Sequence, residues 1–322
     1  MEHKSKILSV VIPTYKSADN IGSLAKRLEN TLSGMPYDYE VIFINDNSPD
    51  KTDDLLKDIC LRNSRIKAVS FSRNFGQQIA TSAGLRFASG DAVIIMDDDL
   101  QDPPEFLPSL VKKWEEGYDV VYAIRKNRKE GILKRLGYRL FYKLIANLSY
   151  VPIPQNSGDF GLIDRKIVEI LNSMPERTRF VRGLRAWVGF KQTGIECDRA
   201  ARFKGRPSYN LFKMLTLSMN GIFAFSDMPL QISSALGFFV SIIAFIGMAV
   251  TLFQRIVTFF FPDSLLAVWP GFSTIVLAIL FLGGVQLISI GILGEYIARI
   301  YNEVKQRPLF LVKETINLDK RN

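Results

Sequence analysis

The chain has 322 residues, of which 48% are hydrophobic and 23% are charged, and 41 Lys plus Arg against 32 Asp plus Glu give a formal net charge of +9. This composition excludes a disordered chain and a highly charged tail for nucleic acid, so we expect no nucleic-acid partner. The single histidine, His3, and two distant cysteines, Cys60 and Cys197, exclude histidine-dependent triads, zinc sites and a disulfide framework, which leaves the chemistry to carboxylates, basic side chains and an oxygen-bound metal.

Residues 1–125 alternate short apolar segments with amphipathic ones. The apolar segments are rich in Val and Ile, as parallel strands are when helices cover both faces of their sheet. This alternation predicts right-handed βαβ units, and therefore an α/β fold with a doubly wound, mostly parallel sheet. The expected strands are residues 7–12, 40–44, 66–71, 92–96 and 119–124, and the expected helices lie near residues 20–32, 52–62, 76–88 and 104–116.

Polar residues cluster where these predicted strands end, and ligands of such sheets bind beyond the carboxyl ends of the strands. The clusters are residues 14–15, 45–48, 72–74 and 97–99, with Arg125 after the fifth strand. No GxGxxG follows a strand and no GxxxxGKS/T occurs in the sequence, which argues against a dinucleotide-dependent dehydrogenase and a P-loop NTPase. A bound nucleotide would therefore be held by side chains and a metal.

The acidic sequence MDDDLQDPPE, residues 96–105, begins where the fourth predicted strand ends. Carboxylates two positions apart at a strand exit can converge on one hard cation, which keeps some of its waters and bridges a substrate diphosphate. Such a cation neutralises the charge that develops on a departing phosphate. A solvated acidic loop is the alternative interpretation of this sequence.

Two stretches between the predicted sheet and the C-terminal third have the pattern of interfacial helices. Residues 132–149 combine basic with aromatic and aliphatic side chains at helical spacing, and residues 208–225 include a plainer amphipathic segment. We expect both to lie at a membrane surface, although ordinary packing helices would share this pattern.

Two long uncharged runs, residues 229–254 and 264–294, follow. Each exceeds the roughly 20 residues that an α-helix needs to cross a bilayer. We expect transmembrane helices at about 232–258 and 268–294, joined by a short turn near 261–267, rather than buried helices of a soluble core. Residues 1–228 would then form the enzymatic domain and residues 299–322 a basic tail.

The basic residues predict the orientation of this membrane segment. The turn between the helices has only Arg255 at its edge and Asp263, whereas the chain beyond the second helix is rich in Lys and Arg. The positive-inside rule therefore places both termini in the cytoplasm. The apolar residues 7–12 are too few for a signal peptide and are expected to form a buried strand.

Several motifs in combination resemble a known family. They are VVIPTY (10–15), NDNSPD (45–50), SRNFG (72–76), DDDLQDPPE (97–105), SGDFGLIDRK (157–166) and, near the end of the chain, GILGEYIARIY (291–301). This set is similar to the GT-A, family-2 glycosyltransferases, and specifically to their polyprenyl-phosphate branch, which includes dolichyl-phosphate mannose synthase and the bacterial GtrB-type enzymes. The resemblance covers nearly the whole chain.

The resemblance implies a donor site at the first, second and fourth strands. Asp46 matches the residue that contacts the nucleotide base, and Pro13 and Tyr15 match the loop around it. The metal and diphosphate motif corresponds to Asp97, Asp99 and Gln101, with Asp98 in its variable middle position among the nucleotide-sugar-binding residues. Arg125 matches a basic residue that faces the donor phosphates.

On the acceptor side, Asp159 matches the family's catalytic aspartate, and Arg202 and Ser208 match the loop that closes over the donor and acceptor phosphates. A lipid phosphate has a second pKa of about 6 and is already largely an anionic nucleophile at neutral pH. Asp159 is therefore expected to position the acceptor or stabilise positive charge at the anomeric carbon, beyond any proton abstraction. A turn residue is the alternative interpretation of this aspartate.

The activity implied is an inverting, Mg²⁺- or Mn²⁺-dependent transfer of a hexose to a polyprenyl phosphate such as undecaprenyl phosphate, with UDP-glucose as the favoured donor. The product would be a lipid-linked sugar for cell-envelope glycosylation, made by a multi-pass protein of the bacterial inner membrane with its catalytic domain in the cytoplasm. The oligomeric state stays open, a homo-oligomer included.

The chain departs from the family pattern at three places. Lys16 and Ser17 replace the usual Asn-Glu, Gly161 replaces a basic residue, and Arg206-Pro207 stand where Glu and Ser are common. Two other functions compete with the transferase. A processive polysaccharide synthase is weakened by the absence of a QxxRW motif and by only two membrane helices, and a catalytically silent scaffold or lipid-flipping partner by the intact acidic motif.

Overall fold

The computed structural model describes residues 6–125, 157–177, 179–198, 228–260 and 272–318. The chain divides into two compact units. The sheet unit comprises Met1–Gly221 and Arg307–Asn322, and the helical unit comprises Ile222–Gln306. The predicted interfacial helices at 132–149 and 208–225, and the predicted turn at 261–267, lie outside the described residues.

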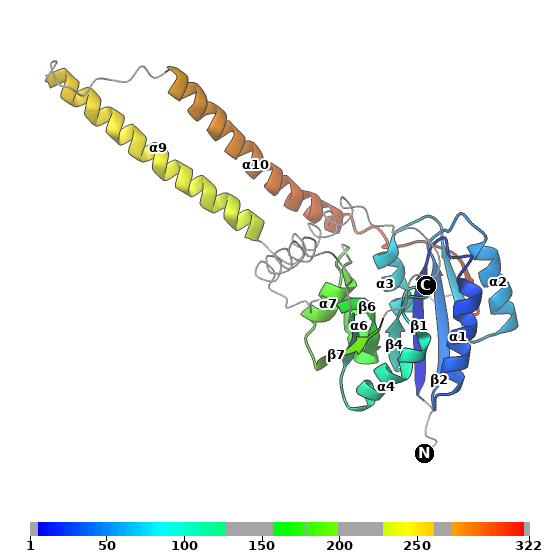
Figure 1. Ribbon diagram of the computed structural model, residues 1–322. Coiled ribbons are helices and arrows are strands. Elements are labelled where there is room, and N and C mark those ends of the chain that lie inside the picture. The colour runs from blue at the N-terminus through cyan, green and yellow to red at the C-terminus, as the bar shows by residue number, and fades with distance from the viewer. Residues whose placement is uncertain (1–5, 126–156, 178, 199–227, 261–271, 319–322) are drawn as a thin grey trace. The chain divides into compact units, whose positions relative to one another are not determined.

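The sheet unit contains an eight-stranded, mostly parallel sheet with the strand order β7-β5-β6-β4-β1-β2-β3-β8 (Figure 1). Within it β6 runs antiparallel to β4 and β5, and β8 runs antiparallel to β3. Because β6 is reversed, its first residues lie at the edge where β4 and β5 end. The strands are β1 (Ile7–Thr14), β2 (Asp38–Asn45), β3 (Ile66–Phe71), β4 (Ala92–Ile95), β5 (Val120–Arg125), β6 (Ser157–Asp164), β7 (Gln192–Cys197) and β8 (Val312–Ile316).

Helices cover both faces of this sheet, which explains why its central strands are apolar along their whole length. Val10 and Ile12 of β1 join a buried cluster with side chains of α1, α2 and α4, whereas Val11 between them faces α3. The helices of the unit are α1 (Ile21–Ser33), α2 (Thr52–Arg62), α3 (Gln77–Phe87), η1 (Pro104–Phe106), α4 (Leu107–Glu115), α6 (Arg165–Ser173) and α7 (Val181–Trp187). The predicted strands and helices of residues 1–125 are thereby confirmed, with ends displaced by a few residues.

Helix α3 packs unusually close to the sheet. A Cβ atom added to Gly84 would lie 2.0 Å from Cγ1 of Val11, so only glycine permits this approach. The contact fixes the height of α3 above β1, and with it the first turn of the helix, which lies beside the carboxyl ends of the strands.

Strand β8 lies within the predicted basic tail over 299–322. Phe310 stacks on Phe71 of β3 with 5.2 Å between ring centroids, and Glu314 forms an ion pair of 2.8 Å with Lys57. The Nδ2 group of Asn317 donates to the carbonyl oxygens of Cys60 (2.7 Å) and Ile66 (2.8 Å). The segment pairs the outer edge of β3, which would otherwise expose unpaired backbone groups.

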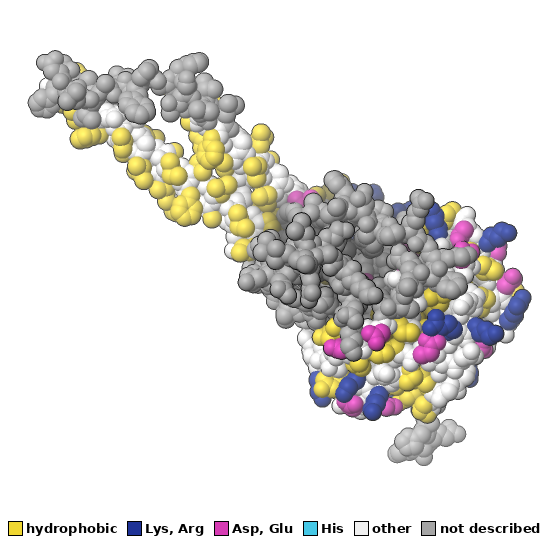
Figure 2. Space-filling view, in the orientation of Figure 1, with side chains coloured by type: hydrophobic (Ala, Val, Ile, Leu, Met, Phe, Trp, Pro, Cys, Tyr) yellow, Lys and Arg dark blue, Asp and Glu magenta, His cyan; other side chains and the backbone are white. Residues whose placement is uncertain are grey.

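The helical unit contains two 33-residue helices, α9 (Met228–Phe260) and α10 (Phe272–Val304), which contact each other. Their most apolar segments, Met228–Gln254 and Phe281–Val304, have mean hydropathies of 2.4 and 1.5 and no residue buried within the molecule. Figure 2 shows hydrophobic side chains along both helices, while charged side chains are spread over the visible part of the sheet unit. Both helices are therefore long and apolar enough to cross a membrane. Helix α10 continues ten residues beyond the predicted end of the second span at 294.

Candidate functional site

The predicted acidic site residues lie at one edge of the sheet, where parallel strands end and β6 begins. Asp46 directly follows β2, and the acidic residues 97–99 follow β4. Asp159 is the third residue of β6 and reaches the same edge because that strand is reversed. The fold thus brings together carboxylates that are more than 100 positions apart in the sequence.

Asp46 is buried and bound to the loop that follows β3. Its Oδ1 accepts the N–H of Phe75 at 2.6 Å, and its Oδ2 accepts the N–H of Gly76 at 2.8 Å. Burial raises the pKa of Asp46, although these two amides favour its charged form. The predicted contact with a nucleotide base stays a prediction, whereas the anchoring of the third loop was not expected.

The first loop, which follows β1, is hydrogen-bonded to Asp98 through backbone and hydroxyl groups. The N–H of Tyr15 donates to Oδ2 of Asp98 at 3.3 Å, and the hydroxyl of Ser17 donates to the same oxygen. Burial raises the pKa of Asp98 to about 6, and the neighbouring Asp99 adds to the rise. Asp98 therefore holds the first loop in place. The hydroxyl of Ser17 can donate to this carboxylate, whereas the glutamate that is usual in the family at position 17 would repel it. Pro13 is buried at the end of β1, and the Tyr15 side chain is 45% exposed.

Asp97 and Asp99 lie on the turn that leaves β4. Oδ1 of Asp97 accepts the side-chain amide of Gln77 at 2.8 Å, and Oδ1 of Asp99 accepts the backbone N–H of Gln101 at 3.1 Å. Leu100, between Asp99 and Gln101, has a φ of +59°, which turns the chain sharply. Among the described residues there is no group of three or more His, Cys, Asp or Glu side chains that could hold a metal. Two carboxylates and an amide nevertheless fit Mg²⁺ or Mn²⁺, because such ions retain waters and take further oxygens from substrate phosphates.

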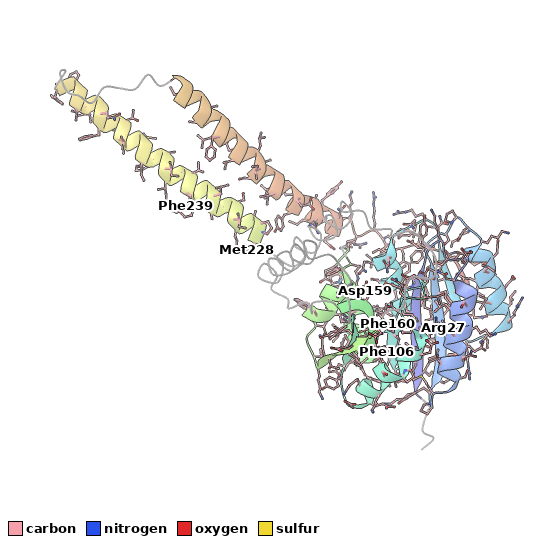
Figure 3. The ribbon with its side chains drawn as sticks, in the orientation of Figure 1. Arg27, Phe106, Asp159, Phe160, Met228 and Phe239 are labelled. Carbon is pink, nitrogen blue, oxygen red and sulfur yellow. The ribbon has the colours of Figure 1, made fainter. Side chains whose placement is uncertain are left out.

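Side chains from two helices, α3 and α7, bind the carboxylate of Asp159. Its Oδ1 accepts Nε (3.2 Å) and Nη2 (3.1 Å) of Arg182, and its Oδ2 accepts the side-chain amide of Gln78 at 3.1 Å. Burial opposes its charge, but Arg182, Arg185 and these hydrogen bonds outweigh burial and lower its pKa. Phe160, the next residue, packs against Phe106 with 6.0 Å between ring centroids (Figure 3). Asp159 is thus an ionised group with dedicated partners and is more than a turn residue.

The two arginines beside Asp159 come from α7 and were missed by sequence reasoning. Arg182 is partly exposed, whereas Arg185 is only 2% exposed and lies over the ring of Tyr122. Burial lowers the pKa of Arg185 to about 10. Their three-residue spacing is visible in the sequence, but nothing there links them to a strand more than 20 positions earlier.

Gly161 explains one departure from the family pattern. A Cβ atom at this position would lie 2.5 Å from the carbonyl oxygen of Val121 and 3.0 Å from Cα of Tyr122. Both are backbone atoms of β5, so no side chain fits there without moving the strand. The positive charge that a basic residue would bring is supplied beside Asp159 by α7.

Three predicted residues cannot be placed in the same detail. Arg125 ends β5 and its backbone is in register with Cys197 of β7, but its side chain lies outside the described part of the structure. Arg202 and Ser208 also lie outside the described residues. Their proposed contacts with phosphate stay predictions.

Comparisons with known proteins show which family the chain resembles over most of its length. Residues 9–171 match the family model for glycosyl transferase family 2. An uncharacterized glycosyltransferase of Synechocystis sp. is 47% identical over 313 residues, which are 97% of this chain and 96% of the relative. The SfII prophage-derived bactoprenol glucosyl transferase of Shigella flexneri is 40% identical over 96% of this chain and 98% of its own length.

Solved structures with a similar fold are less similar to this chain in sequence than these relatives are. Mannosyl-3-phosphoglycerate synthase from Rubrobacter xylanophilus is 19% identical, with a TM-score of 0.49 over 67% of this chain and 71% of that chain. Glucosyl-3-phosphoglycerate synthase from Mycobacterium tuberculosis, solved with Mn²⁺, UDP-glucose and phosphoglyceric acid, is 22% identical, with a TM-score of 0.44 over 68% and 78% of the two chains.

Proposed function

The chain belongs to glycosyl transferase family 2, and we propose that this glycosyltransferase moves glucose from UDP-glucose to a polyprenyl phosphate such as undecaprenyl phosphate. This acceptor and sugar are supported by relatives named bactoprenol glucosyl transferase, which match this chain over 98% of their own length. The observation that carries the proposal is the meeting of an acidic, oxygen-rich loop with an ionised, arginine-bound Asp159 at one sheet edge.

On the donor side, Asp97, Asp99 and Gln101 are the residues that would hold Mg²⁺ or Mn²⁺. A bound divalent ion supplies charge neutralisation for the departing nucleoside diphosphate. Asp46, Pro13 and Tyr15 would bind the nucleotide, and Arg125 would face its phosphates. Asp98 contributes by fixing the first loop around this site.

On the acceptor side, the reaction is a single displacement with inversion. A lipid phosphate oxygen forms a bond to the anomeric carbon, and the bond from that carbon to the diphosphate oxygen breaks with its electron pair on the diphosphate. The acceptor is already largely ionised, since its second pKa is about 6. Asp159 therefore stabilises positive charge that develops on the sugar, and Arg182, Arg202 and Ser208 attract the acceptor phosphate.

The helical unit supplies the membrane location that this acceptor requires. We assign α9 and α10 as transmembrane helices because both are long, apolar and exposed within the molecule. We propose that both termini and the sheet unit lie on the cytoplasmic side of the bacterial inner membrane, a proposal supported by the Lys and Arg residues that follow α10.

The test is sugar transfer by the purified full-length protein. Radiolabelled UDP-glucose, UDP-N-acetylglucosamine and GDP-mannose are each supplied with undecaprenyl phosphate and Mg²⁺ or Mn²⁺. We expect metal-dependent label from UDP-glucose in an organic-extractable, mild-acid-labile lipid, and its loss in Asp99→Ala and Asp159→Ala. The exposed Arg86→Gln, on α3 and away from these carboxylates, is the control that should keep full activity.

Two other outcomes would replace the proposal. Label in a long water-soluble polymer would indicate a polysaccharide synthase. Donor binding without any product would indicate a silent scaffold and would remove the site assignments with it.

A further inference from the structure

The short segment 75–78 joins the loop after β3 to the first turn of α3. The N–H groups of Phe75 and Gly76 bind the two carboxylate oxygens of Asp46. Gly76 has a φ of +97°, a backbone conformation that residues with a side chain rarely adopt. The beginning of α3 is therefore fixed to the end of β2 by a turn that depends on glycine.

The next two residues, Gln77 and Gln78, each donate a side-chain amide to a different carboxylate of the proposed site. Gln77 Nε2 lies 2.8 Å from Oδ1 of Asp97, and Gln78 Nε2 lies 3.1 Å from Oδ2 of Asp159. Consecutive residues of an α-helix point about 100° apart, which allows neighbours to reach opposite sides of the site. One helix turn thus contacts both the donor-side and the acceptor-side carboxylate.

Gln78 is held at both ends of its amide. While Nε2 donates to Asp159, Oε1 accepts the N–H of Val181, the first residue of α7, at 2.9 Å. Helix α7 also carries Arg182, the other partner of Asp159. An amide bound through both its donor and its acceptor has one preferred orientation, and so does the carboxylate it contacts.

We propose that Gln77 and Gln78 are positioning residues for the transfer, Gln77 for Asp97 on the donor side and Gln78 for Asp159 on the acceptor side. This inference rests on the proposed function. A neutral amide suits the role because it orients a carboxylate without cancelling its charge. The two glutamines act on different steps, since one carboxylate would hold the donor's metal and the other would face the reacting sugar.

The test uses Gln77→Glu and Gln78→Glu in the full-length protein, since each keeps the side-chain length and removes one donor. With saturating metal, Gln78→Glu should lower kcat by about 10²-fold and leave KM for UDP-glucose nearly unchanged, as loss of orientation does. Gln77→Glu should raise the Mn²⁺ concentration for half-maximal activity by about 10-fold, with most of kcat recovered at saturating Mn²⁺.

Two controls separate positioning from a general weakening of α3. Arg86→Gln makes the same change in net charge on the same helix at an exposed position, and should leave both parameters unchanged. The uncharged pair Gln77→Ala and Gln78→Ala should show the same division between metal dependence and kcat, with melting temperatures close to wild type.

Each remaining outcome overturns a defined statement. Wild-type transfer with unchanged kinetics in both glutamate variants overturns the inference and leaves the proposed function intact. Equal losses of kcat in all four variants would show that α3 is merely loosened and would also overturn it. Absence of transfer by the wild-type protein overturns the proposed function, and this inference with it.

Discussion

At the scale of single residues, the site is organised by the partners that its carboxylates have in the folded chain. Asp159 stays ionised despite burial because Arg182 and Arg185 face it from α7 and Gln78 faces it from α3. An ionised carboxylate with two cationic neighbours is a weak base. In the proposed reaction its charge would stabilise a positively charged transition state, and a lipid phosphate acceptor would need no base.

Removing Arg182 should therefore change how activity depends on pH. In Arg182→Gln, burial still disfavours the charged form of Asp159 while its nearest cation is lost, so its pKa must rise. The carboxylate then becomes protonated at a higher pH than in the wild-type enzyme, and the fall in kcat should move to higher pH with it. Activity should recover in part at alkaline pH.

The measurement is kcat against pH with saturating lipid acceptor, and Arg86→Gln should reproduce the wild-type profile. Ionisation of the free acceptor, near a pKa of about 6, is the same for all three proteins. Superimposable profiles for Arg182→Gln and the wild type would contradict the assigned role of the ion pair.

At the scale of elements, β6 determines which residues can surround Asp159. Because this strand is reversed, its first residues reach the edge where β4 ends. Its middle residues pair with β5. At Gly161 the two strands leave no room for a side chain, because a Cβ atom there would lie 2.5 Å from the carbonyl oxygen of Val121. The strand accordingly offers a carboxylate at its start and no room for a basic side chain two residues later.

We expect Gly161→Ala to destabilise the sheet unit by about 1–3 kcal/mol, the usual cost of overpacking. Gly22→Ala is the matched control, because a Cβ at Gly22 would meet nothing within 4 Å and Ala favours a helix over Gly. Chemical denaturation of the two variants checks this expectation. A stability of Gly161→Ala equal to that of Gly22→Ala would show that β5 yields at no cost.

Sequence patterns predicted the elements whose packing is local and periodic. The predicted strand at 66–71 coincides with β3, and helix α2 has the predicted bounds of 52–62. Strand β8 was missed because it is a five-residue edge strand with adjacent Lys and Glu residues, whose pairing partner lies far away in the chain. The Arg182–Asp159 pair was missed for a related reason, since only the tertiary structure brings α7 to β6. The acidic loop was found because its residues are contiguous.

At the scale of the whole molecule, the apolar helices are inserted between two parts of one folding unit. The sheet unit is formed by residues before the helices and by Arg307–Asn322 after them. Both ends of the helical unit are therefore covalently tied to the same sheet. Asn317, directly after β8, helps to hold the C-terminal segment on the sheet unit. Its side chain donates hydrogen bonds to the carbonyl oxygens of Cys60 and Ile66, and its φ is +57°.

Asn317→Gly should weaken this connection without distorting it, because glycine tolerates the positive φ but makes no side-chain hydrogen bond. We expect a loss of about 1 kcal/mol for the part-buried acceptors left unpaired, and faster amide exchange in β3 and β8. Hydrogen exchange measured by mass spectrometry checks this, with the exposed Asn30→Gly in α1 as the comparison for a glycine elsewhere. Unchanged exchange in β3 would show that β8 stays paired without Asn317.

The mass of the lipid product decides whether this glycosyltransferase joins one hexose to a polyprenyl phosphate, as we propose. Full-length protein in lipid nanodiscs is supplied with undecaprenyl phosphate, UDP-glucose and Mn²⁺, and the extracted lipid is analysed by mass spectrometry beside Asp159→Asn. We expect undecaprenyl phosphate carrying a single hexose, absent from the variant. Unmodified lipid from the wild-type protein, or the same product from Asp159→Asn at the wild-type rate, would contradict it.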